Sequence, residues 1–137
     1  ITHPEMTRFW ITLQEGVNFV LKNFERMLGG EIFIPKIPSM RVVDLATSMA
    51  PALEQREVGI RPGEKLHEIM CPQDDSHLTL EFEDHFVITP SIHYTSAGNR
   101  FTPNKIGEEG QPVKQGYEYN SGTNPEFLTV EALKTYR

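Results

Sequence analysis

Arg61 and Glu64 are the residues whose types and spacing most clearly suggest a binding chemistry. They flank Pro62-Gly63, where proline fixes φ and glycine lets the backbone bend sharply. An arginine can donate two hydrogen bonds at once to a pyrophosphate, and a nearby carboxylate can accept hydrogen bonds from two sugar hydroxyls. A stiff turn would hold these two groups at a fixed separation, which suits a nucleoside diphosphate. A surface turn closed by an ion pair also explains this spacing, so both interpretations stay open.

Arg8 is a second candidate for contact with an anion. It stands directly before Phe9-Trp10, so an exposed cation over an aromatic face is an equally simple explanation. The remaining candidates are weaker: the five histidines match no common metal-ligand spacing, and Cys71 has no identifiable histidine partner. Glu81 and Glu83 belong to an acidic run that is typical of a solvated strand. We therefore predict no metal site and no catalytic residue in this sequence.

Composition limits the classes of protein to which the chain can belong. Its 137 residues suffice for one domain but not for two ordinary ones, and 38% apolar with 23% charged residues is typical of a globular protein. A net charge of -6 argues against nucleic-acid binding, because phosphate contacts need a basic stripe. No stretch approaches the ~20 apolar residues that span a bilayer, so we predict no membrane contact from this segment. Since the chain begins with Ile1 rather than Met, we expect it to be a piece of a longer protein.

Periodic apolar patterns predict the elements that would position these residues. Apolar residues at helical spacing predict a helix over residues 12–28, which Gly29-Gly30 would end. A continuous apolar run predicts a buried strand over residues 31–35. Further along the chain the patterns predict a short helix from residue 43 or 44 to Pro51, a strand over 56–60, a helical stripe over 66–70, one or two strands over 79–88, a short strand over 117–119 and a short helix over 129–136.

Residues 89–116 are rich in Pro, Gly, Ser, Thr and Asn and show little periodicity. A structureless stretch of this length is uncommon inside a compact domain, so it predicts a flexible arm. We therefore expect a single domain of mixed α/β class over residues 1–137, with this arm between residues 89 and 116.

Several stretches together resemble the inverting UDP-N-acetylglucosamine 4,6-dehydratases, a group of extended short-chain dehydrogenase/reductases that begin pseudaminic acid synthesis. The stretches that carry this resemblance are residues 6–12 (MTRFWIT), 30–40 (GEIFIPKIPSM), 59–68 (GIRPGEKLHE), 82–88 (FEDHFVI) and 119–124 (YNSGTN). The resemblance implies that Arg8 and Arg61 contact the UDP pyrophosphate and that Glu64 accepts hydrogen bonds from the ribose. It also implies that the chain is the C-terminal substrate-binding part of a Rossmann-type fold.

The resemblance further implies what this chain lacks. The family uses NADP to remove a hydride from C4 of the sugar and return it to C6 after water is eliminated, with inversion at C5. The sequence has no glycine-rich fingerprint and no tyrosine followed four positions later by lysine, so we expect these residues before Ile1. The chain alone is therefore expected to be inactive and to bind no cofactor by itself. Its helix over 12–28 and strand over 31–35 should expose apolar surface or repack without the nucleotide-binding half.

The expected partners and place of action come from the same resemblance. They are a UDP-sugar substrate, the N-terminal Rossmann half of the same protein, and further copies in a homo-oligomer, all in the cytoplasm. Two alternatives stay open: a fragment of a nucleotide-sugar epimerase or retaining dehydratase, and a non-catalytic binding module.

Overall fold

The computed structural model describes residues 1–92 and 101–136, and these form two compact units. Unit 1 combines Ile1–Thr12, Ile37–Ile69 and Tyr119–Arg137, whereas unit 2 combines Leu13–Lys36 and Met70–Glu118. Helices and strands occur in both units, so the predicted mixed α/β class is confirmed.

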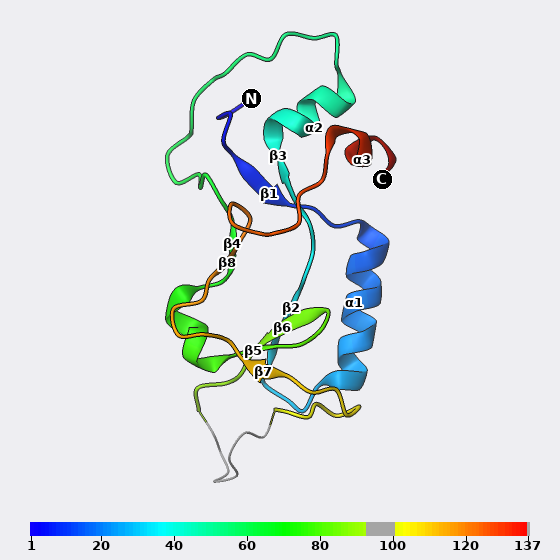
Figure 1. Ribbon diagram of the computed structural model, residues 1–137, viewed down its shortest axis with the longest axis vertical. Helices are drawn as coiled ribbons and strands as arrows, with labels where there is room; N and C mark the ends of the chain where they lie inside the picture. Colours follow the sequence, from blue (N-terminus) through cyan, green and yellow to red (C-terminus); the bar gives the residue numbers. More distant parts are fainter. Residues whose placement is uncertain (93–100, 137) are drawn as a thin grey trace. The chain divides into compact units, whose positions relative to one another are not determined.

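Unit 2 is built on a four-stranded antiparallel sheet (Figure 1). Its strands, in spatial order, are β2 (Ile32–Pro35), β6 (His85–Ile88), β5 (Thr79–Glu81) and β7 (Gln111–Pro112). The β5–β6 pair confirms the strands predicted over residues 79–88, and its register sets Leu80 opposite Val87. The 3-10 helix η1 (Gln73–Leu78) leads directly into β5.

The core of unit 2 lies on one side of this sheet. Leu80, Phe82, Val87 and Phe101 are buried together, and Leu28 and Phe33 pack against them. The Phe82 ring stacks on the His85 ring with centroids 4.5 Å apart. Gly110 makes this arrangement possible, because a Cβ atom there would lie 2.6 Å from the Phe82 ring.

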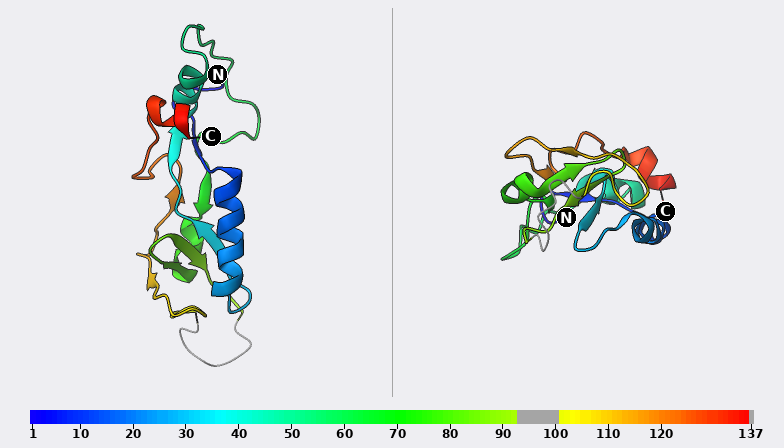
Figure 2. Two further views of the ribbon diagram at one scale, coloured as in Figure 1. Left: turned by 90° about the vertical axis from the view of Figure 1, so that its right-hand side faces the viewer. Right: turned by 90° about the horizontal axis from the view of Figure 1, so that it is seen from below.

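Helix α1 (Leu13–Arg26) confirms the helix predicted over residues 12–28 and runs alongside the sheet of unit 2 (Figure 2). Gly29 and Gly30 follow it with φ of 115° and 91°, and the Glu31 carboxylate accepts hydrogen bonds from the Leu28 and Gly29 amides at 2.6 Å each. These contacts satisfy amides where the helix stops. Much of the apolar stripe of α1 is nevertheless exposed, as expected from the sequence; its exposed members are Leu13, Val17, Val20, Leu21 and Phe24.

Unit 1 contains a two-stranded antiparallel sheet and two short helices. Strand β1 (Thr7–Phe9) pairs with β3 (Ser39–Arg41), and α2 (Val42–Met49) follows β3 without a break. Helix α2 packs against α3 (Val130–Thr135), whose first turn is capped by a hydrogen bond from the Ala132 amide to Thr129 Oγ1. The helices predicted after residue 43 and over 129–136 are thus confirmed.

Three sequence predictions in this part of the chain are wrong or displaced. Residues 56–60 form no strand; they are exposed, and their described backbone bonds reach only Ile1, which offers one residue of pairing rather than a ladder. The helical stripe over 66–70 is replaced by strand β4 (Ile69–Cys71), because the apolar spacing there fits either period over so few residues. Strand β8 (Tyr119–Asn120) is displaced from the strand predicted over residues 117–119, since it begins at Tyr119 instead of residue 117.

The segment predicted as a flexible arm, residues 89–116, is described only in part, since residues 93–100 lie outside the described structure. Residues 101–116 belong to unit 2 and contact both its core and one another. Phe101 is buried in the core, Thr102 Oγ1 exchanges hydrogen bonds with the Gly110 backbone, and Asn104 Oδ1 accepts from the Glu108 amide at 2.9 Å. Flexibility of the arm stays a prediction. Among the helices of the described residues, none is both long enough and apolar enough to span a bilayer.

Candidate functional site

The stretch Arg61–Glu64 forms the turn predicted from its Pro-Gly centre. The Glu64 amide donates to the Arg61 carbonyl at 3.0 Å, and Gly63 has a φ of 80°, a conformation that favours glycine. The Glu64 carboxylate accepts from the Arg61 amide at 3.2 Å. No ion pair joins the two side chains, and within the described residues the exposed Arg61 guanidinium has no hydrogen-bond partner. The turn therefore presents the exposed Arg61 guanidinium next to the Glu64 carboxylate, which is held by a hydrogen bond from a backbone amide.

Arg8 lies next to this turn, on β1. Its guanidinium donates to the carbonyls of Thr7 at 2.7 Å, Lys65 at 3.0 Å and Leu66 at 3.3 Å. It is also 4.0 Å from a Glu64 carboxylate oxygen and 3.5 Å from one of Glu68. The structure thus brings Arg8 and Glu64 together and places both beside the Arg61 turn. The alternative explanation of Arg8, an exposed cation over an aromatic ring, is replaced by these carbonyl contacts.

Behind the same stretch lies a buried hydrogen-bonded group that sequence reasoning missed. Thr7 Oγ1 is 2.8 Å from His67 Nδ1 and 2.7 Å from Ser121 Oγ, and Ser121 Oγ accepts from the Glu68 amide at 2.9 Å. We call Thr7, His67 and Ser121 the hydroxyl relay. Because Thr7 and Ser121 are 114 positions apart, no local pattern could have joined them.

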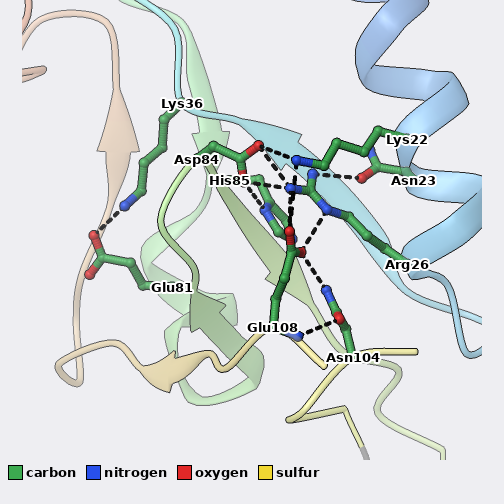
Figure 3. Close-up of polar contacts among 9 residues, drawn as sticks. All are labelled: Lys22, Asn23, Arg26, Lys36, Glu81, Asp84, His85, Asn104 and Glu108. Carbon is green, nitrogen blue, oxygen red and sulfur yellow. Dashed lines mark hydrogen bonds and ion pairs between the residues drawn. The ribbon is translucent and has the colours of Figure 1, made fainter. Parts of the chain in front are cut away.

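Unit 2 contains a second polar cluster around Arg26, shown in Figure 3. The Arg26 side chain is 1% exposed and donates to both oxygens of Asp84 at 2.8 Å. It also donates to Glu108 at 2.8 and 3.1 Å and to Asn23 at 3.3 Å. Lys22 is 3.7 Å from Glu108. We call these residues the Arg26 cluster.

The charges of the Arg26 cluster hold its acids ionised. Burial acts to raise the pKa of Asp84, but hydrogen bonds from Arg26 and His85 outweigh it and lower that pKa to about 2. Hydrogen bonding to Arg26 likewise lowers the pKa of Glu108. For His85 the balance is reversed, since burial lowers its pKa more than the 2.7 Å contact with Asp84 raises it. His85 is therefore a neutral buried ring whose Nε2 has no hydrogen-bond partner among the described residues.

A cavity of ≈ 390 Å³ adjoins the Arg26 cluster and carries more acids than bases. Its lining residues are Lys22, Arg26, Phe82, Glu83, Asp84, Glu108 and Glu109. Within the described residues, no group of three or more histidine, cysteine, aspartate or glutamate side chains is placed to hold a metal ion. Burial raises the pKa of the Cys71 thiol to about 12, so this cysteine is no nucleophile at neutral pH. The Arg26 cluster is thus a set of ion pairs that joins α1 to the segments around Asp84 and Glu108 in unit 2, and we call it an ionic lock.

The residues described here do not fit a dinucleotide cofactor. Such a cofactor needs a glycine-rich turn before a helix N-terminus to receive its pyrophosphate. Helices α1, α2 and α3 are instead preceded by Thr12, Arg41 and Thr129.

Comparison with known proteins gives a consistent family. The family model described as "Polysaccharide biosynthesis protein" matches residues 1–90. The chain is 60% identical over 133 residues to a UDP-N-acetylglucosamine 4,6-dehydratase (inverting) of Campylobacter jejuni subsp. jejuni serotype O:2, which covers 97% of this chain and 40% of that protein. It is 33% identical to a UDP-glucose 4-epimerase of Rickettsia rickettsii, over 98% of this chain and 39% of that protein. The chain thus spans about two fifths of the length of these relatives.

A solved structure shows the same fold. The X-ray structure of Pen from Bacillus thuringiensis matches 98% of this chain and 39% of that chain, with a TM-score of 0.74 and 26% sequence identity. This match fits the predicted C-terminal part of an extended short-chain dehydrogenase/reductase, and the resemblance on which that prediction rested is confirmed. The chain belongs to the polysaccharide biosynthesis protein family.

Proposed function

We propose that this chain is the UDP-sugar-binding portion of a UDP-N-acetylglucosamine 4,6-dehydratase that inverts C5. The observation that carries the proposal is the 60% identity to an inverting dehydratase across nearly the whole chain. Identity of this degree makes a shared substrate class the simplest explanation. The chain would bind and orient the substrate within a larger enzyme.

The geometry of unit 1 supports this role. The free guanidinium of Arg61 can donate two parallel hydrogen bonds to a pyrophosphate. Glu64, with its carboxylate fixed on the turn, can accept from ribose hydroxyls. Arg8 adds positive charge beside Glu64, where a diphosphate would otherwise meet two acids. We assign Arg8, Arg61 and Glu64 as substrate-binding residues.

The chemical step needs a second part of the protein. Hydride removal and return would be supplied by NADP held in a Rossmann half, because this chain offers no fitting cofactor turn. The exposed apolar stripe of α1 is the surface on which we expect that half to pack. Action in the cytoplasm, assembly into a homo-oligomer and use of the product in pseudaminic acid synthesis belong to the same proposal.

An NMR titration of the chain with UDP and then UDP-N-acetylglucosamine tests the proposal. We expect shifts of the Arg8, Arg61 and Glu64 signals and weaker binding in Arg61→Ala, because the free cation at the diphosphate is lost. Arg56→Ala is the matched control, since it removes another exposed arginine of the same loop. Equal effects of the two variants would show that UDP responds only to general charge, and absence of shifts in both the chain and the whole protein would contradict the site.

A nucleotide-sugar epimerase is the second candidate, favoured by the 33% identity to a UDP-glucose 4-epimerase. The two activities differ in product, because an epimerase retains the oxygen at C6 whereas a dehydratase loses it as water. Mass spectrometry of the product of the whole protein separates them. Binding of UDP-sugar without any turnover would favour a non-catalytic module.

A further inference from the structure

The hydroxyl relay of unit 1 fixes the segment that carries Glu64. Ser121 Oγ accepts from the Glu68 amide at 2.9 Å, and the Ser121 amide donates to the Glu68 carbonyl at 2.8 Å. Both backbone groups of Glu68 are thus held by one residue. Arg8 holds the preceding carbonyls of Lys65 and Leu66. The stretch from Glu64 to Glu68 is therefore anchored at several consecutive residues.

The buried partners of the relay determine the direction of its hydrogen bonds. Ser121 is 0% exposed, and within the described residues its Oγ has two partners, the Glu68 amide and Thr7 Oγ1. An amide only donates, so the Ser121 hydroxyl proton must go to Thr7 Oγ1. Thr7 is buried as well, and its remaining partner is His67 Nδ1. The Thr7 hydroxyl proton must therefore go to His67 Nδ1.

This direction fixes the tautomer of His67. Nδ1 accepts, so the proton of the neutral ring lies on Nε2. The reverse direction would leave the Ser121 hydroxyl proton buried with no acceptor, which costs free energy. The ring itself is seated against Gly122, where a Cβ atom would lie 2.7 Å from its Cγ and Nδ1 atoms.

We infer that Ser121 is a positioning residue of the UDP-sugar site and acts through a directed relay, Ser121 to Thr7 to His67, that fixes residues 64–68 against β1. This inference rests on the proposed function, because the segment matters for binding only if Glu64 and Arg61 contact the nucleotide. Ser121 itself touches no substrate in this scheme. Its effect reaches Glu64 through Glu68 and the carbonyls that Arg8 holds.

The first test needs no ligand. Long-range proton–nitrogen correlation spectra of the nitrogen-15-labelled full chain report which ring nitrogen of each histidine carries a proton. We expect His67 to show a single Nε2–H tautomer, which Thr7→Val converts to a mixture because the donor to Nδ1 is lost. Thr7→Ser retains the hydroxyl and should restore the wild-type signature. Ser48→Ala is the matched control, since it removes another buried serine hydroxyl of unit 1, one that donates to the Leu45 carbonyl within α2.

The second test measures UDP affinity in the same proteins. We expect Ser121→Ala to weaken UDP binding about fivefold, the loss corresponding to one net hydrogen bond. Thr7→Ser and Ser48→Ala should bind as the wild type does. An Nδ1–H tautomer in the wild type, or an unchanged His67 signature in Thr7→Val, would overturn the relay. A fixed Nε2–H tautomer with unchanged UDP affinity in Ser121→Ala would overturn the positioning role, and failure of the wild-type chain and the whole protein alike to bind UDP would overturn the proposed function itself.

Discussion

Arg26 in unit 2 and Arg8 in unit 1 show how differently a fold can use one side chain. Arg26 is fully buried, and every nitrogen of its guanidinium donates to a side-chain oxygen at 2.8–3.3 Å. Arg8 is 25% exposed and donates to backbone carbonyls, and its acidic neighbours among residues 1–92 and 101–136 lie at 3.5 and 4.0 Å. A buried guanidinium whose donors are all hydrogen-bonded has no capacity for a ligand. A partly exposed guanidinium with distant acidic partners can exchange one of them for a phosphate.

Both sites carry a cation and neighbouring acids, so charge alone does not distinguish them. They differ in how completely the cation is buried and hydrogen-bonded. The cavity beside Arg26 is lined by polar groups, yet the hydrogen bonds from Arg26 lower the pKa values of Asp84 and Glu108 and hold both acids ionised. The surface around Arg61 has no such closure, since that cation lacks a partner among the described residues. We therefore expect the Arg61 turn of unit 1 to bind an anion and the Arg26 cluster of unit 2 to stabilise the fold against unfolding.

Replacing Arg26 is the strongest way to break this comparison. Arg26→Met leaves Asp84 and Glu108 without their cation, so we expect the free energy of unfolding to fall by about 3 kcal/mol, the lower end for a buried pair because both acids are partly exposed. Urea denaturation measures the loss. Arg41→Met is the control, since Arg41 makes an exposed pair with Asp44 and should cost about 0.5 kcal/mol. Equal losses in the two variants would show that the Arg26 cluster is no lock.

The two glycines that face rings provide the next test. Gly110→Ala would place a methyl group 2.6 Å from the buried Phe82 ring, and we expect a loss of about 1–3 kcal/mol from overpacking. Gly122→Ala would place a methyl group 2.7 Å from Cγ and Nδ1 of the half-buried His67 ring. Moving that ring away breaks its hydrogen bond with Thr7, so we expect a loss of about 1 kcal/mol. Urea midpoints at constant m-value compare them. A larger loss for Gly122→Ala would mean that unit 1 is the more rigidly packed at its ring.

Acid titration tests the neutral state of His85. Its folded pKa lies below the ordinary value of 6.5, so the unfolded chain takes up this proton first as the pH falls. The contribution of His85 to stability is thus complete above pH 6.5 and declines below it. We expect His85→Phe, which keeps a ring against Phe82, to reduce the slope of unfolding free energy between pH 7 and about 5. An unchanged slope would show that the folded pKa of His85 is not lowered from its ordinary value.

Asp84 adds a second, more acidic range in which the free energy of unfolding depends on pH. Its folded pKa of about 2 lies below the ordinary value of 3.8, so its contribution is present above pH 3.8 and is lost as the pH falls towards 2. His85 and Asp84 therefore act in separate pH windows, and their variants should alter different parts of one curve.

The sequence alone could predict those features whose causes are local. Helix α1 was predicted from its apolar spacing and its terminal glycines, and the Arg61–Glu64 turn from a Pro-Gly pair. The strands on either side of Glu83-Asp84 follow from alternation over a few residues. Each of these depends on neighbours within one turn or one hairpin, which is what periodicity records.

The features that were missed depend on distant contacts. Arg26 meets Asp84 and Glu108 at separations of 58 and 82 residues, and no spacing rule links a helical arginine to acids so far along the chain. The free state of Arg61 also needed the structure, because sequence could not tell a bound Glu64 carboxylate from a turn-closing ion pair. Residues 56–60 show the converse error, since their pattern is strand-like but the part of the chain that the structure describes offers them no strand to pair with.

Replacing Arg8 by lysine gives the smallest expected effect and sharpens the comparison most. A lysine keeps the charge but lacks the planar fork, so it cannot hold the carbonyls of Thr7, Lys65 and Leu66 together. Because Arg8 is partly exposed and its acidic neighbours are distant, Arg8→Lys should cost less than about 1 kcal/mol in unfolding free energy.

The signature of Arg8→Lys should be local instead. The amides of Glu64 and Glu68 belong to the anchored stretch and donate to the Arg61 carbonyl and to Ser121 Oγ. We therefore expect faster hydrogen exchange at both while exchange in unit 2 stays unchanged. Arg26→Lys is the matched change in the buried cluster and should do the opposite, lowering global stability with little effect on those two amides. Global destabilisation by Arg8→Lys as large as that by Arg26→Lys would mean that Arg8 is as structural as Arg26, and the cation available to a diphosphate in unit 1 would then be Arg61 alone.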